Sequence, residues 1–266
     1  MEKADGTLDR RSQGLDIVGD IAILGPSGEE KASSKKLANS LLRELPNVKC
    51  VFEQVAAVEG EYRLRRLRHL AGEDRTLTVH KESGCAFKVD VRKCYFSPRL
   101  STERLRVSAL TGRSERVLNM FAGVGPFSIV IAKKAGAKVT SCELNEYACR
   151  LHRENVRTNK VDDRVEVLNI DAADSRKVLS GTFDRVLMPH PSASDKFLRT
   201  ALSLTSPGGM IHYYRHVLGR SEAEAGATLK EELDGILPPG LAYGSRRVRE
   251  VGPRWVEMVA DIRVAD

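Results

Sequence analysis

The sequence lacks an apolar run long enough to cross a membrane, because its longest apolar stretches reach about half of the roughly 20 residues that a spanning helix needs. The first residues, MEKADGTLDRRSQG, have no apolar core, which argues against a secretory signal peptide. Internal repeats and low-complexity segments are also absent. These absences favour a globular protein of the cytoplasm that does not contact a membrane.

Cysteine is sparse, and its spacing excludes two further classes of protein. None of the 5 cysteines forms a CxxC pair, which argues against a disulfide framework and against a zinc ribbon. Reduced cysteines in a cytosolic protein, and no bound metal, are therefore expected. The cysteines are Cys50, Cys85, Cys94, Cys142 and Cys149.

Basic residues are in excess. Lys and Arg number 43 against 36 Asp and Glu, which gives a net charge of +7. This balance suggests an anionic partner without proving one. Arginines crowd two segments, residues 63–68 and 246–254, which predicts phosphate contacts with a nucleic acid there.

The expected elements divide the chain into four parts. Residues 1–14 read as a solvated tail. Residues 15–96 predict a small α+β domain, with a strand over 15–24, a helix over 31–45, and mostly antiparallel strands over 48–58, 75–80 and 85–96. Residues 97–114 hold a linking helix, with Ser101 as its candidate N-cap and Glu103 in its first turn. Residues 115–266 form the largest part.

From residue 115 onward, strands and helices alternate. This order predicts a parallel sheet with helices on both faces, and hence the α/β fold class. Two strands over 246–251 and 254–264 close the chain, and we expect them to add an antiparallel edge to that sheet.

A glycine-rich turn follows the first strand of this region, in the segment LNMFAGVGPFS. Gly123 and Gly125 let the backbone turn tightly and approach a ligand, and Pro126 suits the first turn of a helix. Glu143 ends the next strand, where its carboxylate can accept hydrogen bonds from both ribose hydroxyls of a cofactor. Asp171 ends the third strand and could join that site, or it could be only a helix N-cap.

Two cofactor classes use such a turn. A dinucleotide site requires G-x-G-x-x-G, and here Ser128 replaces the third glycine. S-adenosylmethionine has no phosphate and needs only the loop. The missing glycine therefore favours S-adenosylmethionine, bound at the carboxyl ends of the strands.

The segments FSPRLSTERLRV and LNMFAGVGPFSI together resemble the archaeal and eukaryotic tRNA (guanine-37, N1)-methyltransferase family. The resemblance continues through CELN, LNID, KFLRTAL, GGMIHYY and VREVGPRWVEMVADIRV, and it covers residues 17–264. It implies a Rossmann-like class I methyltransferase domain preceded by a small domain, with S-adenosylmethionine as the methyl donor. The implied substrate is N1 of guanine 37 in the anticodon stem-loop of tRNA, and no obligate protein partner is evident.

The resemblance also assigns roles to single residues. Glu103 matches a carboxylate proposed as the general base for the guanine N1 proton, although a first-turn glutamate can simply favour the helix dipole. Arg63 matches an arginine that stabilises charge on the base oxygen. Tyr95, which could equally be a core residue, and Pro191 are the expected base contacts. The expected cofactor contacts are Arg104, Phe121, Gly123, Gly125, Glu143, Leu144, Asp171 and Ala172.

Two features depart from the family pattern. The family carries Asn-Leu-Pro after the fourth strand, whereas this chain has Pro189-His190-Pro191, and a proline offers neither a side-chain amide nor a backbone N–H. Longer family members also carry an extra N-terminal domain that grips the tRNA, and here we expect a short form without that domain.

Two alternative functions stay open. An aminocarboxypropyl transferase of wybutosine biosynthesis would use the same fold and cofactor, and the lost asparagine keeps this alternative alive, whereas Glu103 and the SPRLSTER segment favour the methyltransferase. A nucleic-acid-binding protein with an inactive cofactor pocket would fit the net charge equally well, although the intact glycine turn, Glu143 and Asp171 argue against it. Whether a wybutosine-pathway base is also a substrate is not decided by the sequence.

Overall fold

The computed structural model describes residues 14–26, 31–56, 58 and 60–266. The chain divides into two compact units, Met1–Arg99 and Leu100–Asp266. The predicted tail, apart from Gly14, lies outside the described residues. No helix in the described part of the chain is both long and apolar enough to cross a membrane.

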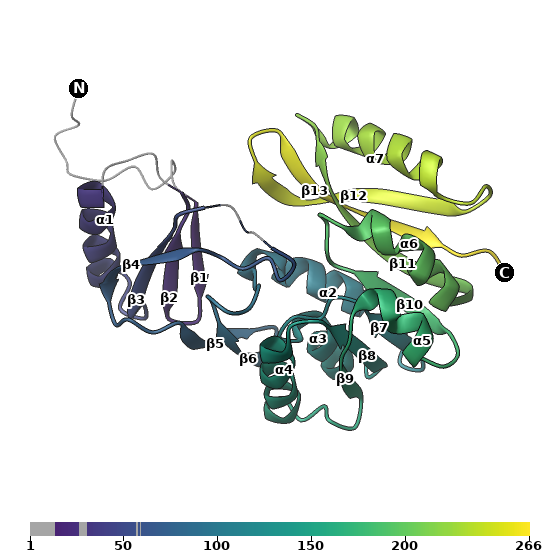
Figure 1. Ribbon diagram of the computed structural model, residues 1–266, viewed down its shortest axis with the longest axis horizontal. Coiled ribbons are helices and arrows are strands. Elements are labelled where there is room, and N and C mark those ends of the chain that lie inside the picture. Colours follow the sequence, from purple (N-terminus) through teal and green to yellow (C-terminus); the bar gives the residue numbers. More distant parts are fainter. Residues whose placement is uncertain (1–13, 27–30, 57, 59) are drawn as a thin grey trace. The chain divides into compact units, whose positions relative to one another are not determined.

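The N-terminal unit contains a four-stranded sheet of order β1-β2-β3-β4 and a separate two-stranded hairpin (Figure 1). The connection from β2 to β3 runs through the helix α1, and these two strands are parallel, while the other pairs are antiparallel. The elements are β1 (Leu15–Val18), β2 (Ile21–Leu24), α1 (Lys31–Glu44), β3 (Cys50–Gln54), β4 (Leu67–Gly72), β5 (Leu77–Glu82) and β6 (Cys85–Asp90).

The single strand expected over residues 15–24 is wrong. Gly19 has a φ of +58°, a backbone conformation that glycine adopts without steric cost, and the chain reverses there. The two halves pair as the antiparallel hairpin β1–β2, with Val18 opposite Ile21. The turn is hard to recognise in the sequence because only Gly19 and Asp20 separate two apolar segments. The second of these segments, β2, is buried along its whole length.

The core of the N-terminal unit forms where α1 packs on β3 and β4. Leucines on one face of the helix meet apolar side chains of the sheet, and burial of such side chains stabilises each by about 1.5–3 kcal/mol. The buried cluster consists of Ala22, Leu24, Leu37, Ala38, Leu41, Val48, Val51, Leu70 and Ala71.

The C-terminal unit has a seven-stranded mixed sheet of order β12-β13-β11-β10-β7-β8-β9. Five adjacent strands run parallel to one another, in the order β11, β10, β7, β8 and β9. Strand β13 pairs antiparallel with both β11 and β12. The elements are α2 (Ser101–Leu110), β7 (Arg116–Asn119), α3 (Pro126–Lys134), β8 (Lys138–Glu143), α4 (Glu146–Thr158), β9 (Val165–Asn169), α5 (Ser175–Val178), β10 (Phe183–Met188), α6 (Ser194–Leu204), β11 (Thr205–Leu218), α7 (Glu222–Ile236), β12 (Ala242–Gly252) and β13 (Trp255–Arg263).

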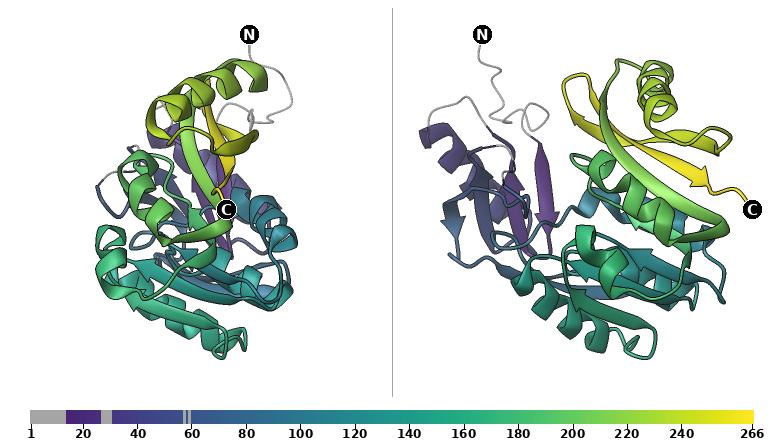
Figure 2. Two further views of the ribbon diagram at one scale, coloured as in Figure 1. Left: turned by 90° about the vertical axis from the view of Figure 1, so that its right-hand side faces the viewer. Right: turned by 45° about the vertical axis from the view of Figure 1, so that its right-hand side comes forward.

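This arrangement confirms the predicted α/β fold class, with an antiparallel edge added by the closing strands. Helix α6 packs on β10 and β11, and α7 packs on β11, β12 and β13 (Figure 2). Ser101 is wrong as the N-cap of α2, because Leu100 occupies that position and no side chain caps the helix.

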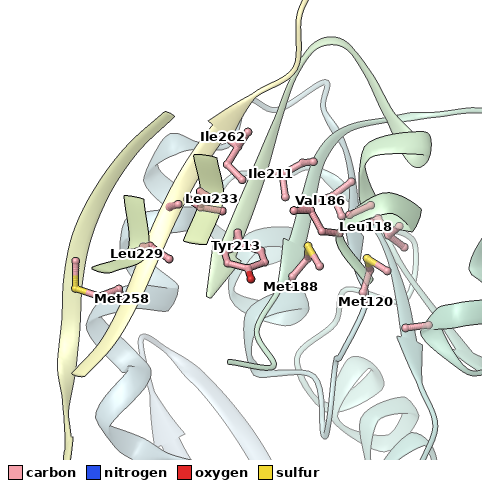
Figure 3. Close-up of a cluster of buried hydrophobic side chains, with 14 of the residues drawn as sticks. Leu118, Met120, Val186, Met188, Ile211, Tyr213, Leu229, Leu233, Met258 and Ile262 are labelled. Carbon is pink, nitrogen blue, oxygen red and sulfur yellow. The ribbon is translucent and has the colours of Figure 1, made fainter. Parts of the chain in front are cut away.

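A large apolar cluster lies between the sheet and helices α6 and α7 (Figure 3). Alternate residues of the strands point into it, including Ile211 and Tyr213 of β11, and Leu229 and Leu233 of α7 meet them. The intervening residues of β11, such as His212 and Tyr214, point to the opposite face of the sheet, since successive side chains of a strand alternate. Polar side chains gather on that opposite face.

Candidate active site

The candidate site of the C-terminal unit lies where four parallel strands end. The chain passes from β7 outward to β8 and β9, and then returns to the other side of β7 to form β10. The strand order therefore reverses between β7 and β10. Ligands of open α/β sheets bind at such a reversal, outside the carboxyl ends of the strands.

The glycine turn joins β7 to α3 at this point. Gly123 and Gly125 both have positive φ, at +56° and +92°, and Pro126 begins the helix. The side chain of Asn155 on α4 donates a hydrogen bond of 3.0 Å to the carbonyl of Val124, which holds the turn from outside. The predicted strand–turn–helix geometry is therefore present at Gly123 and Gly125, whose cofactor contact stays a prediction.

Glu143 ends β8 beside this turn. Its Oε2 accepts a hydrogen bond of 2.7 Å from the backbone N–H of Gly123, and its Oε1 accepts one of 2.8 Å from that of Asn145. Burial raises the pKa of this carboxyl above its usual value. Each carboxylate oxygen has a further lone pair, so Glu143 can hold the turn and still accept from a cofactor hydroxyl.

The residues that follow Glu143 and β9 complete this edge. The carbonyl of Leu144 accepts a hydrogen bond of 3.0 Å from the side chain of Asn169. Asp171 caps the short turn after β9, because its Oδ1 accepts from the N–H of Ala173 at 2.8 Å, and Ala172 is buried. The structure therefore confirms Asp171 as the cap of this turn. The contact of Asp171 with a cofactor stays a prediction.

Phe121 and Pro191 lie after β7 and β10. The ring of Phe121 contacts those of His190 and Phe197, with centroids 5.1 and 5.0 Å apart. Pro191 is buried, and its carbonyl accepts a hydrogen bond of 3.2 Å from the N–H of His216. Because Pro189 supplies no amide here, any hydrogen bond that this segment donates to a ligand must come from another residue.

Glu103, on the first turn of α2, is a buried carboxylate with three donor side chains around it. Its side chain is 3% exposed. Arg106 donates to both of its oxygens at 2.7 and 2.9 Å, Arg246 of β12 donates to Oε2 at 2.7 Å, and Tyr214 of β11 donates to Oε1 at 2.8 Å. Burial and the nearby Glu103 carboxylate raise the pKa of Tyr214 well above its usual value, so this hydroxyl stays a donor. A carboxylate that only favoured a helix dipole would not need this set of partners.

Arg104, the next residue of α2, is almost completely buried, at 1% exposure. Its guanidinium lies 5.9 Å from the ring centroid of Phe127, on the first turn of α3. This contact links α2 to the helix that follows the glycine turn. The contact of Arg104 with the cofactor stays a prediction.

Two predicted base contacts belong to the N-terminal unit and lie against each other. The guanidinium of Arg63 stacks over the ring of Tyr95, 4.6 Å from its centroid. Arg63 has a φ of +52°, which is uncommon for a residue other than glycine, and its Nε has no hydrogen-bond partner among the described residues. The neighbouring Arg65 and Arg68 instead bond to Asp16 and Glu53.

Sequence reasoning missed the residues that surround Glu103. Tyr214 and Arg106 were not selected, and Arg246 lies in a segment for which phosphate contacts were expected, whereas the structure pairs it with Glu103. The sequence nevertheless contains a signal. His212 and Asp261 are polar residues within largely apolar segments, GGMIHYY and WVEMVADIRV. A charged or polar residue inside a buried strand is rarely without a partner, and this pattern could have directed attention to the face that carries Glu103.

Residues 78–230 match the TRM5/TYW2 methyltransferase domain family, and residues 4–76 match the TYW2 N-terminal domain family. The chain is 40% identical to tRNA (guanine(37)-N(1))-methyltransferase Trm5b of Pyrococcus abyssi, over 94% of this chain and 74% of that protein. It is 36% identical to tRNA 4-demethylwyosine(37)-methyltransferase Taw21 of Saccharolobus solfataricus, over 94% of this chain and 93% of that protein.

Two solved structures are also similar. One is the complex of aTrm5 with tRNALeu, with a TM-score of 0.82 and 33% identity over 94% of this chain and 72% of that one. The other is TYW2 of M. jannaschii in complex with AdoMet, with a TM-score of 0.66 and 25% identity over 94% of this chain and 98% of that one. Both similarities extend over the two units described above.

Proposed function

Because the chain belongs to the TRM5/TYW2 methyltransferase family, we propose that it transfers a methyl group from S-adenosylmethionine to N1 of guanine 37 in tRNA, in the cytoplasm. One observation carries this proposal. The C-terminal unit combines the glycine turn and Glu143 with the buried carboxylate of Glu103. The first pair fits a nucleoside cofactor, and Glu103 fits a reaction that must remove a proton from a base.

The proposed chemistry begins at the base. Guanine N1 carries a proton and is a poor nucleophile until that proton leaves, so a positioned carboxylate accelerates the reaction. In the proposal Glu103 accepts this proton while Arg106 and Tyr214 fix its orientation. S-adenosylmethionine, when bound, supplies the electrophilic methyl group.

The cofactor is proposed to lie against the carboxyl ends of β7, β8 and β9. Glu143 would accept hydrogen bonds from the ribose, and Gly123 and Gly125 would let the backbone approach the cofactor closely. The remaining proposed contacts are Arg104, Phe121, Leu144, Asp171 and Ala172. The similarity to a structure that contains AdoMet supports this cofactor.

The anticodon stem-loop is the proposed macromolecular partner. The similarity to a complex with tRNALeu and the net charge of +7 support an RNA substrate. Arg63, Tyr95 and Pro191 are proposed to contact the target base. Arg63 is suited to this role because its guanidinium is planar, always charged and already stacked on the ring of Tyr95.

A second substrate, 4-demethylwyosine at position 37, is favoured by a specific observation. The chain covers 93% of Taw21, whose name gives that base as its substrate. Pro189, which replaces the asparagine of the family pattern, instead keeps the aminocarboxypropyl transferase open as an alternative. The base is therefore the open choice between the two methyltransferases, and the transferred group is the choice between them and that transferase.

Mass spectrometry of product nucleosides tests the proposal. The purified chain is incubated with S-adenosylmethionine and, in parallel, with unmodified tRNA carrying G37 and with tRNA carrying 4-demethylwyosine. We expect 1-methylguanosine from the first tRNA. Methylation of the second tRNA alone would replace guanine by the wyosine base as the substrate. A nucleoside heavier by an aminocarboxypropyl group would overturn methyl transfer, and cofactor binding without any product would indicate an inactive pocket.

A further inference from the structure

Arg106 lies between two carboxylates on the polar face of the sheet. It donates to both oxygens of Glu103, as described above, and its Nη1 and Nη2 donate to the two oxygens of Asp261 at 2.6 and 3.2 Å. One guanidinium thus forms a fork with each acid, which fixes its plane more firmly than a single contact would. Asp261 is on β13, so this strand helps to fix the position of Glu103 through Arg106.

His212 holds Asp261 from the other side. Its Nδ1 is 2.6 Å from Asp261 Oδ1, and its Nε2 is 2.7 Å from Nη1 of Arg185. An arginine can only donate, so Nε2 must accept, and the ring proton must be on Nδ1 and point to Asp261. The ring is completely buried, and burial lowers its pKa, which agrees with a neutral imidazole.

Arg185 connects this arrangement to the end of helix α2. Its Nη2 donates to the carbonyl of Leu110 at 2.6 Å, and its Nε and Nη2 donate to Glu115 at 2.7 and 3.0 Å. The helix that carries Glu103 is therefore held at two points, through Arg106 and through the carbonyl of Leu110. Arg106 binds Asp261 directly, and Arg185 binds His212, which in turn contacts Asp261.

The charges in this network balance. Three acids face three arginines, while His212 is neutral. The acids are Glu103, Asp261 and Glu115, and the arginines are Arg106, Arg246 and Arg185. The groups that face Glu103 itself are Arg106 from α2, Arg246 from β12 and Tyr214 from β11. Asp261 accepts from two N–H donors of Arg106, so the guanidinium is held in one orientation toward Glu103.

We propose that Asp261 is a positioning residue for Glu103, which acts through Arg106, and that His212 keeps Asp261 in that role. This inference rests on the proposed function, in which Glu103 accepts the proton of the base. Asp261 touches neither substrate nor cofactor in this scheme. It sets the orientation of the residue that does.

The test is the single-turnover methylation rate at saturating tRNA and cofactor, measured together with the affinities for tRNA and S-adenosylmethionine. Asp261→Asn keeps the shape and removes the charge, so Arg106 loses one of the two carboxylates that fix its plane. The rate should fall by about threefold to tenfold, because a less well oriented base transfers the proton less effectively. Both affinities should stay unchanged.

Three further variants separate this effect from a loss of structure. Arg106→Gln removes the link between Asp261 and Glu103 and should lower the rate at least as much, which keeps the test decisive if Asp261→Asn does not fold. Asp261→Glu keeps the charge and should retain most of the wild-type rate. Asp195→Asn, which removes the acid from a separate pair with Arg215, should leave the rate unchanged.

An unchanged rate in both Asp261→Asn and Arg106→Gln, with only lower stability, would overturn the proposal and make the network a structural one. Failure of the proposed function gives a different result. In that case the wild-type chain itself forms no methylated guanine or wyosine base.

Discussion

The imidazole of His152 lies so close to Gly125 that a Cβ at position 125 would be 2.2 Å from its Cδ2 atom. Gly125 also has a φ of +92°. The turn therefore needs glycine for two independent reasons, backbone conformation and space. His152 is completely buried on α4, and neither ring nitrogen has a hydrogen-bond partner among the described residues. The residue fills space beside the turn instead of bonding to it.

Gly125→Ala should lower the free energy of unfolding by about 2–4 kcal/mol, because it adds a steric overlap to the strain of a positive φ. Cofactor binding should weaken at least tenfold, since the turn must shift. Gly240→Ala is a matched control, because Gly240 has a φ of +89° and nothing within 4 Å of the added Cβ. It should cost only about 1 kcal/mol. Urea unfolding and calorimetry with S-adenosylmethionine measure both, and equal losses in the two variants would contradict the role given to His152.

His152 should also make folding sensitive to mild acid. Burial lowers its pKa to about 3, whereas an unfolded histidine titrates near 6.5. The unfolded chain therefore binds this proton more readily, and stability falls as the pH drops from about 6.5 towards 3. Between pH 7 and pH 5 this residue alone should remove about 2 kcal/mol from the free energy of unfolding.

His152→Leu removes the titrating group, and its free energy of unfolding should decline less than that of the wild type over the same interval. Urea unfolding at pH 8, where histidines are neutral in both states, gives the purely structural cost of the substitution. Parallel pH dependences in the two proteins would show that His152 is not responsible.

Glu103→Gln should lower the single-turnover rate by about 10²–10⁴ while cofactor and tRNA affinities change little. Glu232→Gln provides a matched control on the opposite face of the sheet. Tyr213 and Tyr214 are neighbours on β11, and each donates a hydrogen bond of 2.8 Å to a glutamate that also binds an arginine, Glu232 for Tyr213 and Glu103 for Tyr214. Glu232→Gln should leave the rate unchanged. A loss confined to tRNA affinity in Glu103→Gln would make Glu103 a binding residue.

Cofactor affinity should fall as the pH is lowered, because protonation of Glu143 removes the charge that strengthens its hydrogen bonds with the ribose hydroxyls. Burial raises the pKa of Glu143, so the loss should begin at a higher pH than for an exposed glutamate. Glu143→Ala should weaken binding by about 1.5–3 kcal/mol and remove this pH dependence. Calorimetry from pH 5 to pH 8 measures the cofactor affinity. Glu166→Gln, which changes an exposed glutamate, is the control variant. An affinity independent of pH in the wild type would place the ribose elsewhere.

Sequence reasoning succeeded where the physical cause is local. The turn with Gly123 and Gly125 lies in the predicted place because glycine and proline restrict the backbone within a few residues. Glu143 ends its strand, as expected. The alternation of strands and helices likewise predicted the parallel sheet, and the two strands that close the chain predicted its antiparallel edge.

It failed where the cause is distant in the chain. β4 was not expected because its segment is rich in arginine, yet the side chain of Arg68 pairs with Glu53 on the adjacent strand β3. The partners of Glu103 were missed for the same reason, since Tyr214 and Arg246 follow it by 111 and 143 residues. Pairings of this kind depend on strand order and facing, which local patterns do not encode.

The fork between Arg106 and Asp261 also has a consequence for biosynthesis. The two residues are separated by 155 positions, which at about 5–20 residues per second correspond to roughly 8–30 s of translation. Helix α2 emerges from the ribosome long before β13 exists to receive it. During that interval Glu103 and Arg106 can pair with each other, but the network that orients them is incomplete. The nascent chain can therefore form the glycine turn first, and it organises its proposed proton acceptor last.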